Sequence, residues 1–488
     1  MLYDLIIRDA LVIDGSDQPG FRADVAIREG RIQRIGSLDG VSAVEEINAA
    51  GRVLAPGFID VHTHDDTVVI RKPQMLPKIS QGVTTVIVGN CGISASPVSL
   101  AGDPPDPMNL LGTSAAFVYP RFSDYRNAVD KARPAVNVAA LIGHTALRSN
   151  HMDDLLRTAS PDEISAMREQ LRDSLESGAL GLSTGLAYAS AFSAETTEVK
   201  QLAEELTAFG AVYTTHLRSE FEPVLEAMDE AFDIGRHAKS PVVISHMKCA
   251  GAGNWGRSPQ LLASLEKAAK DHPVGCDCYP YAASSSTLDL KQVTDAFRIT
   301  ITWSTPHPDQ SGRDLKDIAA DWQLSLLDAA RKLQPAGAVY YGMDEQDVQR
   351  IMSHPLSMIG SDGLPEDPFP HPRLWGAFPR VLGHFSRDLG LFPLHTAVHK
   401  MTGLSAARFG LHERGLIREG YWADLVLFNP DTVLDVADFK NPQQAAEGID
   451  GVWVNGQLSY ADGKAQGERQ GKFLPRSGSL VDGFSQAT

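Results

Sequence analysis

Eight short apolar runs, separated by segments with helical patterning, are the feature that most constrains the fold of this chain. The runs are GFIDVHTH, VTTVIVGNCG, NVAALIGHT, ALGLSTGLAY, AVYTTHLRS, PVVISHMKC, PVGCDCYPY and SMIGSDG. Among the helical segments, the one that begins at Ser160 has Pro161 at its first position and Glu163 completing a capping box. Strand–helix repetition predicts an α/β fold, and eight repeats favour a (β/α)8 TIM-like barrel over an open doubly wound sheet.

Both ends of the chain carry a different, all-β pattern. DLIIRDALVID and ADVAIREGRIQRIG are typical of short strands, and near the other end GVWVNGQLSYADG holds an Asn455-Gly456 pair, which is typical of a tight hairpin. We therefore expect one small β-sandwich domain built from 1–55 and 418–488, and a catalytic barrel domain at 56–417. The stretch 284–344 after the seventh run is too long for an ordinary connection, so we expect an inserted lid segment over the barrel mouth.

Composition excludes several classes of function. The chain has 61 acidic and 44 basic residues, a formal charge of -17, which disfavours nucleic acid and membrane surfaces as partners. No apolar run is long enough to span a bilayer, and MLYDLIIRDALVIDG alternates like a strand rather than a signal peptide. The four cysteines do not suggest a disulfide framework, so we expect a cytoplasmic location.

Polar residues gather at the predicted carboxyl ends of the strands, where barrel enzymes carry their reactive groups. They are His62, His64, Cys91, His144, His216, His246, Lys248, Tyr279 and Asp362. His-x-His on a strand would place both imidazoles on one side, because side chains alternate. Imidazole and thiolate together suit zinc, and a carboxylate can share such a site. The sequence therefore predicts a zinc site assembled from several strands.

Each of these residues also has an ordinary interpretation. A histidine at a strand end is often a hydrogen-bonded core residue, Cys91 is small enough to be a buried apolar side chain, and Asp362 could cap its own turn. An enzyme of another class is also compatible with them, a metal-independent cysteine amidase with Cys91 as nucleophile and a histidine as base. Sensitivity to a chelator distinguishes that alternative from a zinc enzyme.

Several motifs together resemble one known family. PGFIDVHTHDD, GVTTVIVGNCGIS, YTTHLRSE, VVISHMK, YPY and MIGSDGLPEDPFPHPRLWG are similar to the D-aminoacylases, or N-acyl-D-amino-acid deacylases, of the amidohydrolase superfamily. The resemblance runs through nearly the whole chain. It implies a (β/α)8 barrel with a small β-domain and an insertion after the seventh strand.

The resemblance also implies a division of roles among the site residues. One zinc ion would be held tightly by Cys91, His216 and His246, and a second, weaker ion would use His62 and His64, with Cys91 and Asp362 nearby. Asp362 would be the catalytic acid and base. One absence supports this branch: many binuclear relatives bridge their metals with a carboxylated lysine on the fourth strand, and GLSTGLAY has none.

An amide is a poor electrophile and neutral water is a poor nucleophile, so a zinc enzyme uses a metal and a base to activate them. Zinc lowers the pKa of a bound water toward about 7 and polarises the acyl carbonyl, so zinc-bound hydroxide is the expected nucleophile. Asp362 is expected to take the water's proton and return it to the departing nitrogen, because an amide anion cannot leave.

The resemblance assigns the substrate contacts too. Lys248, Tyr279 and Arg373 would hold the α-carboxylate, and Tyr340 and Met343 would form an apolar side-chain pocket. With the carboxylate and the acyl carbonyl fixed, one enantiomer fits, and the resemblance implies that it is D. We expect N-acyl derivatives of apolar D-amino acids such as Met, Leu and Phe.

An acidic substrate is the alternative. Arg298, near the start of the insertion, could pair with a side-chain carboxylate and favour an N-acyl-D-glutamate or N-acyl-D-aspartate deacylase. A solvated surface position is the expectation for this arginine, because long basic side chains are mostly exposed.

Overall fold

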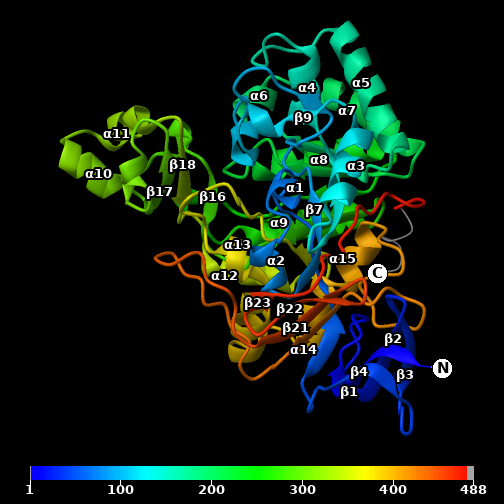
Figure 1. Cartoon of the computed structure of the whole chain (residues 1–488). Helices are drawn as coiled ribbons and strands as arrows, with labels where there is room; N and C mark the ends of the chain where they lie inside the picture. Colours follow the sequence, from blue (N-terminus) through cyan, green and yellow to red (C-terminus); the bar gives the residue numbers. More distant parts are fainter. Residues whose placement is uncertain (1, 481–488) are drawn as a thin grey trace.

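A computed structural model describes residues 2–480, and it combines a run of parallel strands and flanking helices with a sheet shared by both chain ends (Figure 1). The expected α/β class is confirmed by this arrangement and by the match to solved amidohydrolases given below. No helix in the described part of the chain is both long and apolar enough to cross a bilayer.

Every one of the eight apolar runs contains a parallel strand. These strands are β6 (Phe58–Asp60), β7 (Val83–Val88), β10 (Asn137–Ala140) with β11 (Ile142–Gly143), β12 (Gly181–Gly185), β13 (Val212–His216), β14 (Val242–Ile244), β15 (Val274–Cys278) and β19 (Ser357–Ile359). Strands β7 and β15 are buried along their whole length, as expected for strands covered on both faces.

Pairing follows the order of the sequence. Strands β6, β7 and β10 form one parallel sheet, and β11, β12, β13, β14, β15 and β19 form another. The Leu180 amide donates to Ala140 O at 2.8 Å, which joins the two sheets. Thr63 and Gly363, just beyond β6 and β19, form a parallel bridge. The carboxyl ends of the first and last strands therefore meet.

Helices follow the strands and cover them. The longer ones are α3 (Phe122–Ala132), α4 (His144–His151), α5 (Pro161–Glu176), α7 (Thr196–Thr207), α8 (Val224–Ala238), α9 (Ser258–Ala269), α12 (Glu345–Ser353), α13 (Arg373–Arg380) and α14 (Leu394–Met401). The short ones are α1 (Val68–Arg71), α2 (Leu76–Ile79), α6 (Ala189–Phe192) and α15 (Gly403–Arg408). Helix α5 begins as predicted, because the Ser160 and Glu163 side chains each accept the other's backbone N–H.

The two chain ends share one sheet of nine strands. They are β1 (Tyr3–Val12), β2 (Phe21–Arg28), β3 (Arg31–Gly36), β4 (Ala43–Asn48), β5 (Val53–Pro56), β20 (Leu425–Phe428), β21 (Ile449–Val454), β22 (Gln457–Ala461) and β23 (Lys464–Ala465). Strand β5 pairs antiparallel with β20, so the start and the end of the chain are joined directly. The Asn455-Gly456 hairpin is confirmed, and both residues have the positive φ that such a tight turn requires.

The segment after β15 forms a small unit of its own. It contains β16 (Ser284–Thr287), β17 (Ile299–Ser304), α10 (Leu315–Trp322), α11 (Leu326–Leu333) and β18 (Ala336–Tyr340). The strands form an antiparallel sheet in the order β16-β18-β17, and the unit has a separate apolar core. In Figure 1 its helices α10 and α11 project to one side of the molecule. A two-stranded sheet of β8 (Val98–Ser99) and β9 (Val118–Tyr119) completes the strands.

Candidate metal and active site

The side chains predicted to bind metal lie just beyond the ends of the parallel strands. His62 and His64 follow β6, Cys91 follows β7, His216 ends β13, His246 follows β14 and Asp362 follows β19. The expected His-x-His alternation on a strand is wrong in detail, because β6 already ends at Asp60. The path of the following turn, rather than the strand pleat, sets the direction of the two imidazoles.

Four of these side chains form one buried group. Ligand atoms of His62, Cys91, His246 and Asp362 all lie within 4.8 Å of one another. Cys91 Sγ is 3.2 Å from His62 Nε2 and 3.3 Å from His246 Nε2. His64 joins them through its Nε2, which is 3.1 Å from Asp362 Oδ1. A thiol, imidazoles and a carboxylate from separate strands are thus brought together.

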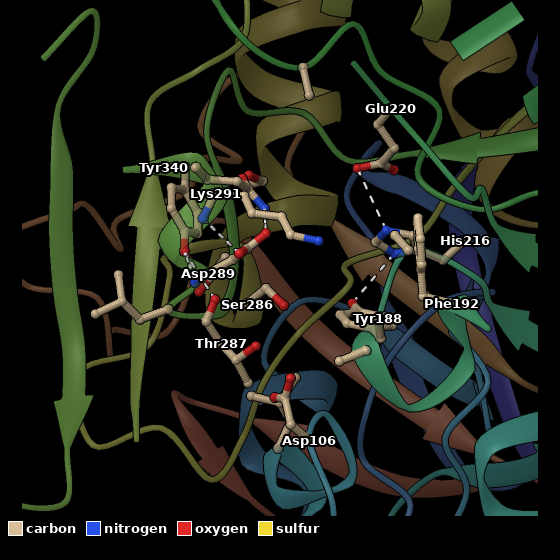
Figure 2. Close-up of a pocket in the computed structure, with 18 of the residues that line it drawn as sticks. Asp106, Tyr188, Phe192, His216, Glu220, Ser286, Thr287, Asp289, Lys291 and Tyr340 are labelled. Carbon is tan, nitrogen blue, oxygen red and sulfur yellow. Dashed lines mark hydrogen bonds and ion pairs between the residues drawn. The ribbon is translucent and has the colours of Figure 1, made fainter. Parts of the chain in front are cut away.

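His216 lies at the edge of this group, next to two residues that the sequence reasoning missed. Its ring is 4.5 Å from the ring of His246, and with that residue and Glu220 it forms a second set with metal-ligand chemistry. The Tyr188 hydroxyl is 3.4 Å from His216 Nδ1, and Figure 2 shows Tyr188 and Glu220 on either side of the imidazole.

Carboxylates set the orientation of two of the imidazoles. Asp277 Oδ2 lies 3.3 Å from His62 Nδ1, and Glu220 Oε1 lies 2.9 Å from His246 Nδ1. For His62, the carboxylate on Nδ1 fixes the proton there and leaves Nε2 toward Cys91. The His246 Nδ1 also lies 2.7 Å from the Lys248 ammonium, and its Nε2 likewise faces Cys91. The available sequence clues are a charged residue inside the apolar run VGCDC and a glutamate four residues after His216.

The backbone at three of these residues is unusual. Cys91, His246 and Asp362 have φ values of 53, 35 and 48°, in the left-handed region that non-glycine residues rarely occupy. Such conformations cost free energy and persist where the surroundings determine them, which is common at functional sites. The structure thus holds a thiol, an imidazole and a carboxylate in strained turns that direct them to one point.

The positive charges of neighbouring side chains keep the Cys91 thiol and the Asp362 carboxyl in their anionic forms. Burial raises the pKa of the Cys91 thiol, but the imidazoles of His62 and His246 outweigh burial and hold that pKa well below its ordinary value. Burial likewise raises the pKa of Asp362, and the Arg373 guanidinium together with His64 lowers it well below the usual range. Both groups are therefore anions at neutral pH, the form in which they bind a cation.

A cavity of about 980 Å³ adjoins the group. His64, His216, His246 and Asp362 line this cavity together with residues of the insertion. Figure 2 shows His216 on one side of the cavity and Asp289, Lys291 and Tyr340 on the other. Cys91 is only 1% exposed and is not part of the wall. A small molecule in this cavity can reach the carboxylate and imidazoles but not the thiol.

The three residues expected to bind a carboxylate are adjacent. The Lys248 ammonium and the Arg373 guanidinium lie 5.8 Å and 4.6 Å from the centroid of the Tyr279 ring. Lys248 and Tyr279 line the cavity, and the Lys248 ammonium also donates to Glu220. Arg373 is fully buried behind Asp362, with Nη1 2.9 Å from Asp362 Oδ2.

Other predicted residues have different surroundings. The Tyr340 hydroxyl donates to Thr287 O at 3.0 Å while its ring lines the cavity, and Met343 Sδ is 3.8 Å from the Tyr279 hydroxyl. Arg298 is half exposed, pairs with Asp314 at 2.8 Å and does not line the cavity, as expected for a surface residue.

His144, although it also follows a strand, is buried in a separate group. Its Nε2 is 2.8 Å from a Glu198 oxygen, and the same carboxylate accepts two hydrogen bonds from Arg148. This histidine therefore belongs to an ion-paired group between α4 and α7 rather than to the candidate metal site.

The sequence matches a known family of proteins. A sequence model described as the Amidohydrolase family matches residues 45–460. Three proteins of Alcaligenes xylosoxydans xylosoxydans are similar over almost their full length. The D-aminoacylase is 49% identical (97% of this chain, 98% of the relative), the N-acyl-D-aspartate deacylase 47% (96% and 95%) and the N-acyl-D-glutamate deacylase 46% (98% and 98%).

Solved structures are equally close. A crystal structure of D-aminoacylase superimposes with a TM-score of 0.95 at 51% identity, covering 97% of this chain and 100% of that one. An N-acyl-D-glutamate deacylase from Bordetella bronchiseptica, complexed with zinc and a phosphonate inhibitor that mimics the tetrahedral intermediate, superimposes with a TM-score of 0.94 at 44% identity, covering 98% and 100%.

Proposed function

The chain belongs to the amidohydrolase family, and on that premise we propose that it hydrolyses the amide bond of N-acyl-D-amino acids, releasing a carboxylate and a free D-amino acid. The observation that carries the proposal is the buried group of His62, Cys91, His246 and Asp362, which adjoins a cavity lined by Lys248.

We also infer that the parallel strands close into a (β/α)8 barrel, with residues 56–417 as the catalytic domain and 284–344 as its insertion. Support comes from the sequential strand order and from the Thr63–Gly363 bridge between the first and last strands. For 1–55 with 418–488, of which Met1 and 481–488 lie outside the described residues, we infer a small β-sandwich. Apolar residues of β1, β2, β5, β20 and β21 share one core there, as two packed layers require.

The residues present suit zinc. Thiolate and imidazole are its preferred ligands, and His64 Nδ1 is a buried nitrogen without a hydrogen-bond partner. We infer that Cys91, His216 and His246 hold the tight ion, and that His62 and His64, with Cys91 and Asp362, offer a weaker position. His246 supports this division because it belongs to both close sets of ligand atoms, the one with Cys91 and the one with His216. When bound, zinc supplies Lewis-acid polarisation of the acyl carbonyl and acidifies water.

Proton transfer is assigned to Asp362. Its carboxylate lines the cavity and is kept anionic by Arg373, so it can accept a proton from the attacking water. As the C–N bond breaks, Asp362 gives that proton to the departing nitrogen. The immediate products are then a carboxylic acid, which still carries the water's second proton, and an amine. The acid ionises at neutral pH and the amine takes up a proton, so a carboxylate and an ammonium group leave, and Asp362 has returned to its initial anionic state.

Substrate orientation is assigned to the residues around Tyr279. Lys248 and the Tyr279 hydroxyl offer a charge and a donor toward the α-carboxylate from the cavity wall. Arg373 lies behind Asp362, so its direct contact with the substrate stays a prediction. With the carboxylate at Tyr279 and the acyl carbonyl beside Asp362, the side chain has one remaining direction. We infer that this geometry selects the D enantiomer.

Apolar D-amino acids are the proposed side-chain class. Tyr340 lines the cavity, whereas Met343 lies against the Tyr279 hydroxyl and is not part of the cavity wall, so its contact with the substrate stays a prediction. Asp106 and Asp289 line the same cavity, and their negative charge opposes an acidic side chain. One observation favours the N-acyl-D-glutamate or N-acyl-D-aspartate alternative. Lys291 also lines the cavity, and its ammonium has no ion-pair partner among the described residues, only the Phe192 ring at 5.2 Å.

A comparison of kcat/KM values tests the proposal. We expect N-acetyl-D-methionine to be hydrolysed faster than N-acetyl-D-glutamate and N-acetyl-D-aspartate, and all three faster than their L enantiomers. A preference for D-glutamate that disappears in Lys291→Met would establish the alternative. Activity that survives a chelator but is lost in Cys91→Ala would instead point to a cysteine amidase.

A further inference from the structure

Lys78 is a lysine without solvent exposure, an unusual environment for an ammonium group. It lies on α2, and its side chain is not part of the cavity wall. Its ammonium donates to Asp60 Oδ2 at 2.7 Å, Thr63 Oγ1 at 2.9 Å and Ser361 Oγ at 2.9 Å, and Asp65 Oδ2 is 3.2 Å away. Every proton of the ammonium therefore has a partner.

These partners come from the two segments that carry the candidate catalytic residues. Thr63 stands between His62 and His64, and Ser361 immediately precedes Asp362. Asp60 connects the segments further, because its Oδ1 accepts from the Ser361 amide at 2.8 Å. Lys78 thus joins the end of the first parallel strand to the end of the last one.

The turn after Ser361 is one of the three strained turns of the site. Asp362 has a φ of 48°, and its amide donates to His62 O at 2.7 Å. The Gly363 amide donates to Ser361 Oγ at 3.1 Å, the same hydroxyl that accepts from Lys78. A strained turn keeps its shape only while such contacts hold it, so loss of the ammonium would release the segment that aims Asp362.

The charges of Asp60 and Asp65 strengthen their contacts with the Lys78 ammonium. Burial lowers the pKa of Lys78, but the charges of Asp60 and Asp65 outweigh burial and raise it above the ordinary value. The ammonium therefore stays charged at neutral pH. Two buried carboxylates depend on it, and removing one partner of a buried ion pair leaves the other charge uncompensated.

We propose that Lys78 is a positioning residue for hydrolysis, which acts through Ser361 to fix the turn that presents Asp362. The proposal rests on the proposed function, in which Asp362 moves the proton. It differs from a purely structural role because it predicts loss of turnover in folded protein, with little change in substrate binding.

Lys400 provides a matched control. It is also buried, at 2% exposure, and it donates to His354 O and to Ser357 O. Those two residues precede or begin β19, whereas Ser361 and Asp362 follow it. Lys400→Met and Lys78→Met therefore each remove a buried ammonium group, at opposite ends of the same strand. The two sites differ in charge, because Lys78 pairs with two carboxylates and Lys400 bonds to backbone carbonyls, so Lys78→Met is expected to lose more Tm.

The test compares kcat, KM and Tm for Lys78→Met and Lys400→Met on N-acetyl-D-methionine, with zinc per chain measured alongside. We expect both variants to lose Tm and to keep the tight zinc ion. In Lys78→Met alone, kcat should fall about 100-fold while KM changes little, because a displacement of about 1 Å has that effect on a reacting group. An unchanged kcat in Lys78→Met, or an equal fall in both variants, overturns the proposal.

Ser361→Ala decides the question if Lys78→Met does not fold, because it removes only one hydroxyl. We expect its kcat to fall, and an unchanged kcat in this variant also overturns the proposal. In Lys78→Met/Ser361→Ala the losses in kcat should be less than additive, since both substitutions break the same chain of contacts.

If the parent protein itself leaves all N-acyl-D-amino acids intact, the proposed function has failed and the role of Lys78 fails with it. An active parent with an unaffected Lys78→Met variant sinks the Lys78 proposal alone.

Discussion

Asp362→Asn separates proton transfer from the shape of the site. Asparagine has nearly the same volume as aspartate and is enriched at positive φ, so it suits the φ of 48° better than alanine does. Its amide oxygen keeps a polar atom next to Arg373, whose Nη1 forms an ion pair with Asp362 at 2.9 Å in the parent protein. What it lacks is an anionic oxygen that can take up a proton.

The expected loss in kcat follows from this change. Removing a general base costs about 10²–10⁴ in rate, or about 3–5 kcal/mol of barrier at about 1.4 kcal/mol per factor of ten. We expect the upper part of this range, because Asp362 both accepts the proton and returns it. Stability should also fall, by about 3 kcal/mol or less, since the substitution leaves the buried Arg373 without its counter-charge.

The assay is the initial rate of D-methionine release from N-acetyl-D-methionine, per folded molecule and with zinc content measured on the same sample. We expect the tight zinc ion to remain, because Cys91, His216 and His246 are unaltered. Asp367→Asn is the matched control. This aspartate is in the same loop, is 6% exposed and does not line the cavity, and burial raises its pKa to about 7. A near-normal kcat in Asp362→Asn, or an equal loss in the control, would refute the assignment.

Three further predictions concern metal, insertion and acid stability. Protein purified without added metal should contain about one zinc per chain and lose turnover on chelation, and metal-free active protein would contradict the metal assignment. A substrate analogue should protect 284–344 from proteolysis if this segment closes over the cavity, whereas equal cleavage with and without analogue would argue against a lid. Burial raises the pKa of Glu198, but His144 and Arg148 outweigh it and lower the pKa from 4.5 to about 2, which corresponds to about 3 kcal/mol. That stability is complete above pH 4.5 and is lost as the pH falls toward 2. Glu198→Gln should therefore lower the free energy of unfolding at pH 7 but not near pH 2. An equal loss of free energy at both pH values would be inconsistent with this reasoning.

Local features were readable from the sequence because they depend on neighbours along the chain. The eight apolar runs predicted the parallel strands, Ser160 and Glu163 predicted the start of α5, and Asn455-Gly456 predicted a hairpin. The chemistry of the site was readable as well, since the identity of a donor atom does not depend on the fold.

Contacts between distant residues were decided by the tertiary structure alone. His144 and His246 both follow strands in the sequence, yet one pairs with Glu198 and the other lies against Cys91. Nothing in the sequence indicated a role for Lys78, because its partner Ser361 is 283 residues away along the chain. The spacing of apolar residues predicts which face of a helix or strand is buried. Which distant residue contacts that face depends on strand order and on the path of each turn. Residue type thus determined what this site can bind, and the assembled fold determined which of those residues reach one another.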